Sequence, residues 1–144
     1  MIQFASQGFK KGEPPSHQQS VAFVKNFCCV WMDKIVPGAD MMLIELHLPW
    51  RVVFPYDFRA KHKLKYNKHD YDIGFSSRYN PILVIEIGAI GDDTRHSKIQ
   101  QRINDGVAFD YLDEYYPHCR KYRFHKYDAM DENWLKKELF QEIK

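Results

Sequence analysis

Residues 70–91 read DYDIGFSSRYNPILVIEIGAIG, a pattern that predicts two short β-strands joined by a polar turn. Each predicted strand carries one carboxylate among apolar residues: Asp72 follows Tyr71, and Glu86 lies between Ile85 and Ile87. Folding about the turn brings Asp72 level with residues 85 and 86, to within one residue of register. The two carboxylates are therefore expected to be close neighbours.

This closeness has an electrostatic consequence. An ionised carboxylate in an apolar strand costs several kcal/mol unless it is paired or bound to a metal. Two such charges about 4 Å apart repel each other by roughly 4 kcal/mol at an effective dielectric constant of about 20. A positive group is therefore expected between Asp72 and Glu86. Asp70 is the alternative to Asp72, because residues two apart share one face of a strand.

The composition indicates a globular protein without a membrane segment. The 144 residues are 15% aromatic and 28% charged, which argues against a disordered chain. The net charge of +2 does not by itself indicate a nucleic-acid partner. The three cysteines include no CxxC pair, so buried free thiols in a reducing compartment are expected rather than a zinc site. Because the sequence has neither a signal peptide nor a membrane-length apolar run, we expect a cytoplasmic protein with no membrane contact.

The remaining sequence predicts an α/β fold. Apolar residues at helical spacing predict three helices, over residues 18–36, 97–116 and 131–143. A helix between two strands implies a crossover and therefore a mixed sheet. The chain is expected to form a single α/β domain over residues 18–144, a mixed β-sheet flanked by helices, after an irregular N-terminal arm at residues 1–17.

Three further segments complete the prediction. Residues 41–54 favour extended structure divided by Pro49, or else a short helix that begins at Asp40. Residues 120–127 alternate basic and aromatic side chains and suit an edge strand. Residues 59–69 are strongly basic, and they are either a solvated loop or a loop that contacts phosphates.

Asp72, the hairpin, the Glu86 strand and a following helix with Lys98 and Gln101 resemble the PD-(D/E)XK nuclease superfamily. The resemblance covers roughly residues 40–127, and the chain is also similar to the small nucleases of archaeal filamentous viruses. It implies a restriction-endonuclease-like core, and a location in the host cytoplasm if the chain is viral. The activity it implies is that of a Mg²⁺-dependent (or Mn²⁺-dependent) deoxyribonuclease, acting on double-stranded DNA with low sequence specificity.

The resemblance also assigns the metal ligands. Asp72, Glu86 and the main-chain carbonyl of Ile87 are expected to hold the ion, because carboxylate and carbonyl oxygens are the ligands that Mg²⁺ prefers. Glu45 matches an acidic residue that many members of the family carry upstream of the aspartate, and it is the candidate for a fourth acid.

The chain departs from the family at Gly88, which stands where the family has its lysine. Lys98 is the best-placed replacement for that cation, followed by Arg95 and Gln101. Phosphate contacts to DNA are expected from the basic residues Arg59, Lys61, Lys63, Lys65, Lys68, Arg95 and Arg102. The histidines near these segments are expected to be ordinary surface or half-buried residues, namely His47, His62, His69 and His96.

Two alternatives to the enzyme remain. Gly88 fits a non-catalytic nucleic-acid-binding protein that keeps the nuclease fold. The acidic pair also fits a protein–protein interaction domain, in which a partner's arginine or Lys98 neutralises it. The sequence leaves the oligomeric state open, a dimer included, and a fold-level analogy does not by itself establish function.

Overall fold

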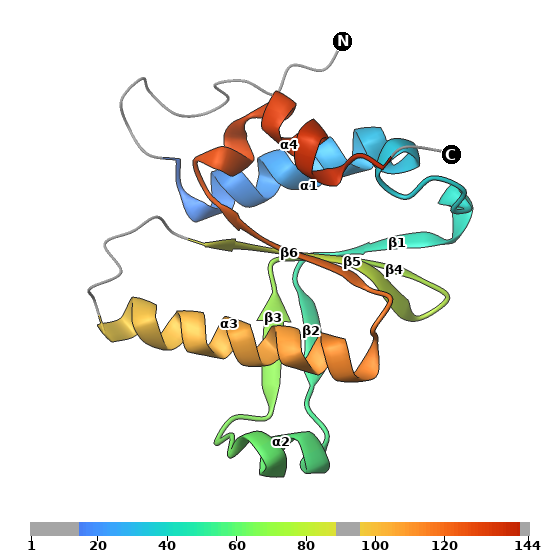
Figure 1. Ribbon diagram of the computed structural model, residues 1–144. Coiled ribbons are helices and arrows are strands. Elements are labelled where there is room, and N and C mark those ends of the chain that lie inside the picture. Colours follow the sequence, from blue (N-terminus) through green and yellow to red (C-terminus); the bar gives the residue numbers. More distant parts are fainter. Residues whose placement is uncertain (1–14, 89–95, 142–144) are drawn as a thin grey trace. The chain divides into compact units, whose positions relative to one another are not determined.

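The structure is a computed structural model that describes residues 15–88 and 96–141, with only the backbone of residues 96–105. Helices both precede and follow its strands along the chain (Figure 1). In chain order they are α1 (His17–Ile35), the 3₁₀ helix η1 (Met41–Leu43), β1 (Ile44–His47), β2 (Trp50–Val53), α2 (Tyr56–His62), β3 (Lys68–Tyr71), β4 (Ile73–Ser77), β5 (Asn80–Gly88), α3 (His96–Tyr115), β6 (Arg120–His125), the 3₁₀ helix η2 (Asp128–Met130) and α4 (Glu132–Leu139).

Within the described residues, the strands form two sheets. A mixed four-stranded sheet has the order β1-β4-β5-β6, and β2 pairs with β3 in a two-stranded antiparallel sheet. The strand predicted over residues 120–127 is β6, and it lies at the edge of its sheet. The helix α3 connects β5 to β6 in the chain. The prediction of an α/β protein with a mixed sheet is therefore confirmed.

The described residues form two compact units. One consists of residues 15–44, 87–88 and 123–141, and the other of residues 45–86 and 96–122. The arm predicted over residues 1–17 lies mostly outside the described residues, so its irregular character stays a prediction, as does the single domain over residues 18–144. None of the helices in the described part of the chain is long and apolar enough to cross a membrane.

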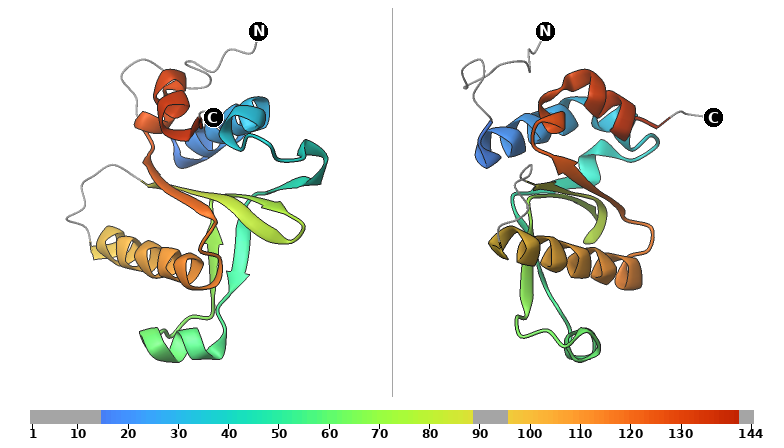
Figure 2. Two further views of the ribbon diagram at one scale, coloured as in Figure 1. Left: turned by 45° about the vertical axis from the view of Figure 1, so that its right-hand side comes forward. Right: turned by 60° about the vertical axis from the view of Figure 1, so that its left-hand side comes forward.

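In the first unit, α1 and α4 lie side by side (Figures 1 and 2). A capping box starts α1: Ser16 Oγ accepts a hydrogen bond from the Gln19 N–H, and Gln19 Oε1 accepts one from the Ser16 N–H. The Phe27 ring of α1 stacks on Phe140, which follows α4, with centroids 5.9 Å apart. The helices predicted over residues 18–36 and 131–143 are thus present, the second one ending at Leu139 in the structure.

The three cysteines are free thiols, as predicted. Cys28 is buried in α1, but its neighbour Cys29 is exposed, so the predicted burial of Cys29 is wrong. With 3.6 residues per helical turn, adjacent side chains point about 100° apart, and both cannot face the core. Burial raises the pKa of the Cys119 thiol to about 12, which keeps that thiol protonated at neutral pH.

In the second unit, the β2–β3 sheet packs against α3 and β5. One cluster of buried side chains joins these elements, namely Val52, Phe54, Phe58, Tyr71, Val84, Ala108, Tyr111, Leu112 and Cys119. The Tyr71 hydroxyl donates a hydrogen bond of 2.6 Å to the carbonyl oxygen of Ala108 in α3. This bond fixes the end of β3 next to the hairpin that carries the two carboxylates.

The basic segment over residues 59–69 is not a continuous loop, so that part of the prediction is wrong. Its first residues complete α2, and its last residues belong to β3. Pro55 is the N-cap residue of α2 and has an extended backbone (φ −65°, ψ 158°), and Phe58 anchors the helix because only 1% of it is exposed. Lys63 then ends α2 in the left-handed conformation.

Residues 41–54 contain both of the alternatives that the sequence left open. Asp40 Oδ1 accepts a hydrogen bond of 3.0 Å from the Met42 N–H and so caps the short helix η1. The strands β1 and β2 follow, separated at Pro49 as predicted. Each alternative was correct for one part of the segment.

The hairpin of β4 and β5 confirms the predicted turn. Arg78 and Tyr79, between the two strands, both have positive φ, as the central residues of a tight hairpin turn require. The antiparallel register pairs Ile73 with Ile85. If this register is continued by one residue, Asp72 lies opposite Glu86. This agrees with the predicted register to within the stated one residue.

Candidate functional site

Glu86 is a buried carboxylate in the middle of an apolar strand. It lies on β5 between Ile85 and Ile87, and only 5% of it is exposed. Its Oε1 atom accepts a hydrogen bond of 2.8 Å from the main-chain N–H of Asp72, the residue between β3 and β4. The structure thus brings together the two residues that the sequence singled out, through the backbone of Asp72.

His69 faces the other oxygen of Glu86. The distance from His69 Nε2 to Glu86 Oε2 is 3.6 Å, and the two side chains are 13% and 6% exposed. The imidazole also packs edge-on against the Tyr71 ring, with centroids 4.7 Å apart. The sequence predicted an ordinary surface or half-buried histidine at this position. The signal that could have indicated its place is its spacing of two from Tyr71, which gives both side chains one face of β3.

Asp70, the alternative to Asp72, is held by a different partner. Arg51 on β2 donates two hydrogen bonds to it, from Nε to Oδ1 at 2.7 Å and from Nη2 to Oδ2 at 3.0 Å. These hydrogen bonds and the charge of the guanidinium lower the pKa of the Asp70 carboxyl. Asp70 is thus bound to Arg51, whereas Asp72 is the aspartate whose main chain is bonded to Glu86.

Gly88, where the family has its lysine, lies under a guanidinium group. A side chain at this position would begin 2.9 Å from Nη2 of Arg123, which comes from the neighbouring strand β6. The Gly88 carbonyl accepts a hydrogen bond of 3.0 Å from the Lys126 N–H. The sequence predicted that residues 120–127 form an edge strand, but it gave no role to Arg123 in that strand. The pairing of β6 with β5, which brings Arg123 to Gly88, cannot be inferred from the local sequence pattern.

Several predicted site residues lie where the structure does not describe their side chains. Lys98, Gln101 and Arg102 are in the first half of α3, of which only the backbone is described, and Arg95 lies outside the described residues. The roles of these residues stay predictions. Glu45, the candidate fourth acid, is on β1 with 69% of its side chain exposed, and its Oε2 lies 4.0 Å from His47 Nε2.

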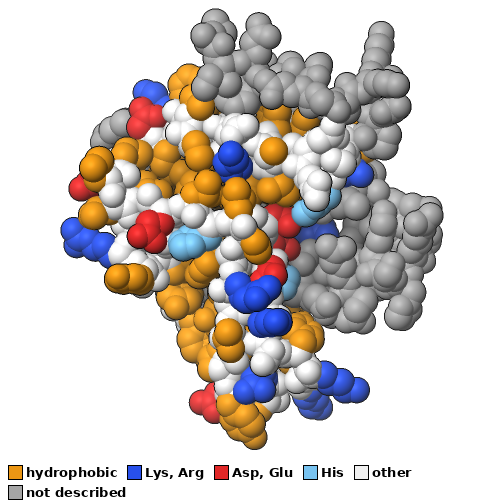
Figure 3. All heavy atoms as spheres, turned by 180° about the vertical axis from the view of Figure 1, so that it is seen from behind, with side chains coloured by type: hydrophobic (Ala, Val, Ile, Leu, Met, Phe, Trp, Pro, Cys, Tyr) orange, Lys and Arg blue, Asp and Glu red, His pale blue; other side chains and the backbone are white. Residues whose placement is uncertain are grey.

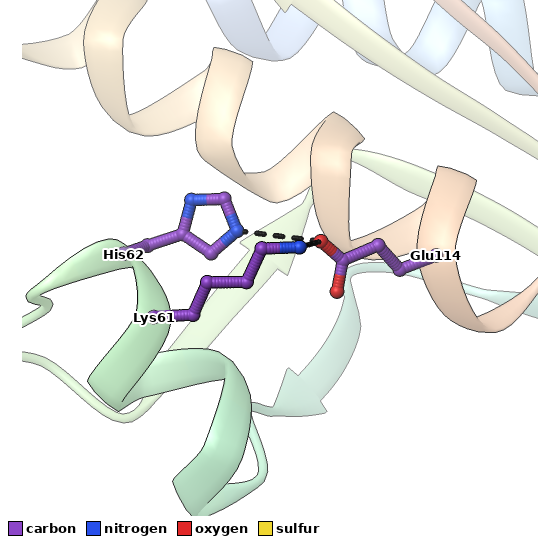
Figure 4. Close-up of polar contacts among 3 residues, drawn as sticks. All are labelled: Lys61, His62 and Glu114. Atoms are coloured by element: carbon purple, nitrogen blue, oxygen red, sulfur yellow. Dashed lines mark hydrogen bonds and ion pairs between the residues drawn. The ribbon is translucent and has the colours of Figure 1, made fainter.

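The basic residues lie on α2 and on the segment that leads from α2 into β3. Lys61 donates a hydrogen bond of 2.6 Å to Glu114 Oε1, which is also 3.5 Å from His62 Nε2 (Figure 4). These contacts lower the pKa of Glu114, chiefly through the hydrogen bond from Lys61. Lys and Arg side chains gather on this part of the molecule (Figure 3). Of the predicted phosphate contacts, Lys63, Lys65 and Lys68 are exposed.

Arg59 is less available than these lysines. Its Nε donates a hydrogen bond of 3.2 Å to the Phe54 carbonyl, and its guanidinium lies over the Tyr56 ring at 5.8 Å from the centroid. Arg59 therefore helps to hold α2 as well as offering a positive charge at the surface.

The fit of a metal ion to this site rests on Glu86 and its neighbours. In the part of the chain that the structure describes, no group of three or more His, Cys, Asp or Glu side chains converges as a complete ligand set. The Glu86 carboxylate and the His69 imidazole do approach each other, and the Asp72 backbone is fixed against the same carboxylate. His69 and the Asp72 main chain thus each contact one oxygen of Glu86, but these three residues do not form a group of side chains that could hold a metal ion by themselves.

Comparison with protein-family models, with curated proteins and with solved structures gives no match to this chain.

Proposed function

We propose that this chain is a deoxyribonuclease that depends on Mg²⁺ or Mn²⁺ and hydrolyses phosphodiester bonds of double-stranded DNA with little sequence selectivity. Its fold is then the restriction-endonuclease-like core that the sequence resembles. The observation that carries the proposal is the Glu86 carboxylate, which is almost completely buried in an apolar strand and is held against Asp72. A buried carboxylate of this kind destabilises the fold unless a positive charge compensates it.

The neighbouring residues support a metal-binding role for this carboxylate. Asp72, Glu86 and the Ile87 carbonyl would hold the ion, with the hairpin of β4 and β5 fixing their spacing. When bound, the ion offsets the charge of the two carboxylates and polarises the phosphoryl oxygen of the DNA. The hydrogen bond from the Asp72 N–H keeps one Glu86 oxygen in a fixed orientation, so that little reorganisation is needed on binding.

A second positive charge is needed near the phosphate that is cleaved, because negative charge develops there in the transition state. Lys98 on α3 and Arg123 on β6 are the candidates. Arg123 covers Gly88, which is two residues after Glu86 on β5 and therefore on the same face of that strand. A loss of cleavage in Lys98→Ala or in Arg123→Ala, with DNA binding kept, identifies which residue supplies the charge.

The exposed lysines support binding to the DNA backbone. Lys63, Lys65 and Lys68 project from one segment between α2 and β3, and phosphate contacts of this kind carry no sequence information. Arg51 and Lys61 are already paired with Asp70 and Glu114, so they contribute less net charge to the surface. Binding to DNA should therefore depend strongly on salt and weakly on sequence.

Cleavage of linear duplex DNA by the purified chain tests this function. We expect cutting with Mg²⁺ or Mn²⁺, none in EDTA, and a loss of at least about 100-fold in rate for Glu86→Gln with DNA binding retained. The matched control is Glu138→Gln, which removes an exposed carboxylate from α4 and should cut at the wild-type rate. Cutting by Glu86→Gln at the wild-type rate would show that Glu86 is not catalytic.

Gly88 favours a second candidate, a nucleic-acid-binding protein that keeps the fold without the chemistry. A glycine cannot supply the charge that the lysine of the family supplies. Binding of duplex DNA without cleavage under any divalent ion would select this candidate over the nuclease.

A further inference from the structure

We propose that a pocket between the start of β5 and the end of α3 binds an unpaired nucleobase, so that the chain prefers duplex DNA with a single-stranded overhang to blunt duplex DNA. The turn that joins β4 to β5 contacts the neighbouring nucleotide. This inference rests on the proposed function, because it names the form of DNA that the proposed nuclease binds. None of its residues belongs to the predicted metal site or to the predicted phosphate contacts.

The pocket lies within the second unit and has a volume of about 340 Å³. Its wall combines Asn80 and Pro81 at the start of β5 with residues that end α3 or follow it, among them Tyr115, Tyr116 and His118. None of the described residues that line it is Asp, Glu, Lys or Arg. Mostly apolar walls with a few polar groups are typical of small-molecule sites, whose volumes begin near roughly 300 Å³. The pocket therefore suits a flat, uncharged ring better than a phosphate group.

Two tyrosines give the pocket aromatic walls that are already fixed by packing. The Tyr115 ring stacks on Tyr111 with centroids 4.9 Å apart. The Tyr116 ring packs edge-on against Tyr111 and Trp50, with centroids 6.2 Å and 6.5 Å away. Tyr111 is 7% exposed and Tyr115 is 42% exposed, so this group of rings extends from the core to the surface. A nucleobase can add to it, because every base has a π-face on which an aromatic side chain stacks.

Polar groups at the pocket match the edge of a base. Asn80 and His118 are both exposed residues of its wall. The side-chain amide of Asn80 offers a hydrogen-bond donor and an acceptor, and base edges present donors and acceptors in the same way. Stacking with one or two edge contacts is the usual mode by which proteins hold unpaired bases.

The turn next to the pocket carries two large side chains at positions where a hairpin favours small ones. It lies at the free end of the β4–β5 hairpin, where Ser77 pairs with Asn80 (Figure 1). Arg78 and Tyr79 have φ of 52° and 70°, whereas turns of this kind favour Asn-Gly or Asp-Gly. Tyr79 is also 94% exposed, so its ring gains nothing from packing in the core. Side chains kept in an unfavourable conformation at the surface indicate a use outside the fold.

The two side chains of the turn suit the nucleotide next to the one in the pocket. An exposed aromatic ring stacks on a base, and a guanidinium group binds a phosphate. Arg78 is exposed and lies two residues before Asn80, which lines the pocket. The pocket and the turn together thus offer stacking, an edge contact and a positive charge to one short single-stranded segment.

Binding of DNA by the full chain in EDTA tests this inference without any cleavage. The probes are a fluorescently labelled blunt duplex, the same duplex with an overhang of two adenines, and the same duplex with an overhang of two abasic residues. The abasic overhang keeps the phosphates and removes only the bases. By fluorescence anisotropy, we expect the adenine overhang to bind at least about tenfold more tightly than either of the other probes.

Variants assign the effect to the pocket and to the turn. Tyr115→Leu and Tyr79→Gly each remove a ring, and each should reduce the preference for the adenine overhang at least about fivefold while changing the Kd for blunt duplex less than about twofold. Tyr115→Phe should keep the preference, since the ring remains. The matched control is Tyr127→Ala, which removes a tyrosine that is 47% exposed in the first unit and should bind every probe as the wild type does.

The melting temperature of Tyr79→Gly separates a role in binding from a role in folding. Glycine is favourable at positive φ, so this variant should melt at or above the temperature of the wild type although it binds the overhang less tightly. A lowered melting temperature together with weaker binding would show that the Tyr79 ring supports the fold, which contradicts its assignment to the DNA contact.

The outcomes also separate this inference from the proposed function. Equal affinity of the wild type for the adenine and abasic overhangs overturns the inference and leaves the nuclease proposal standing. A preference for the adenine overhang that both Tyr115→Leu and Tyr79→Gly keep overturns the assignment to this pocket. The expected preference without cleavage under any divalent ion supports the inference and overturns the nuclease. A chain that binds none of the probes overturns both.

Discussion

Replacing Glu86 by glutamine should stabilise the protein when no metal is present. The substitution keeps the shape of the side chain and its carbonyl oxygen, so the hydrogen bond from the Asp72 N–H can persist. It removes a charge that is buried to 5% exposure in an apolar strand. The folded protein then no longer bears the desolvation cost of this carboxylate, although it also loses the ion pair of Glu86 with His69.

The size of the effect follows from these contacts. Burying an ionised carboxylate costs several kcal/mol, while exchanging a charge-assisted hydrogen bond for a neutral one loses about 1 kcal/mol. The net expectation for Glu86→Gln is a gain of about 1–3 kcal/mol in the free energy of unfolding. For a chain of this length that corresponds to a rise in Tm of roughly 3–10 °C.

Urea and thermal denaturation in EDTA at pH 8 measure this difference. Glu138→Gln, at an exposed position, should stay within about 0.5 kcal/mol of the wild type. A Glu86→Gln variant that is less stable than the wild type by 1 kcal/mol or more would contradict this expectation, because the ion pair of Glu86 with His69 would then stabilise the fold by more than the desolvation of the carboxylate costs.

Three further predictions concern the surroundings of the site. Tyr71→Phe removes the hydrogen bond to the Ala108 carbonyl and should lower the free energy of unfolding by about 1 kcal/mol in urea; an unchanged value would mean that the bond contributes nothing. The pKa of Asp70 is lowered by Arg51, so this pair stabilises the fold above the ordinary aspartate pKa, and the stabilisation is lost as the pH falls through the lowered value. Unfolding of Asp70→Asn measured from pH 2 to pH 6 should therefore lack that acidic loss, and a curve parallel to that of the wild type contradicts it. Replacing Lys63, Lys65 and Lys68 together by alanine should reduce the slope of log K against log salt for duplex DNA by about 2.7, and an unchanged slope would place the phosphate contacts elsewhere.

Much of the fold follows from local patterns in the sequence. The turn before Asn80 and the alternation around it predict the β4–β5 hairpin, and the spacing of residues such as Phe27 and Leu112 predicts the helices that they anchor. The helix α2 was not predicted, because Phe58 is its one buried side chain and most of the residues around Phe58 are charged. A helix of seven residues has too few positions to show a periodicity.

The candidate site was predictable only in part, because only some of its contacts follow from local sequence patterns. Asp72 and Glu86 belong to one hairpin, so their closeness depends on a short-range register that the sequence encodes. His69 meets Glu86, and Arg123 meets Gly88, through contacts between strands that are further apart in the chain. Contacts of that kind depend on how the strands are ordered, and no local pattern specifies that order.

The central claim is that Asp72 and Glu86 hold a divalent metal ion together. A crystal structure of the chain grown with Mn²⁺, with anomalous scattering recorded to locate the metal, tests it most directly. We expect a Mn²⁺ peak about 2.0–2.3 Å from a carboxylate oxygen of each of these two residues. A map in which saturating Mn²⁺ leaves both carboxylates without a metal ion would contradict it.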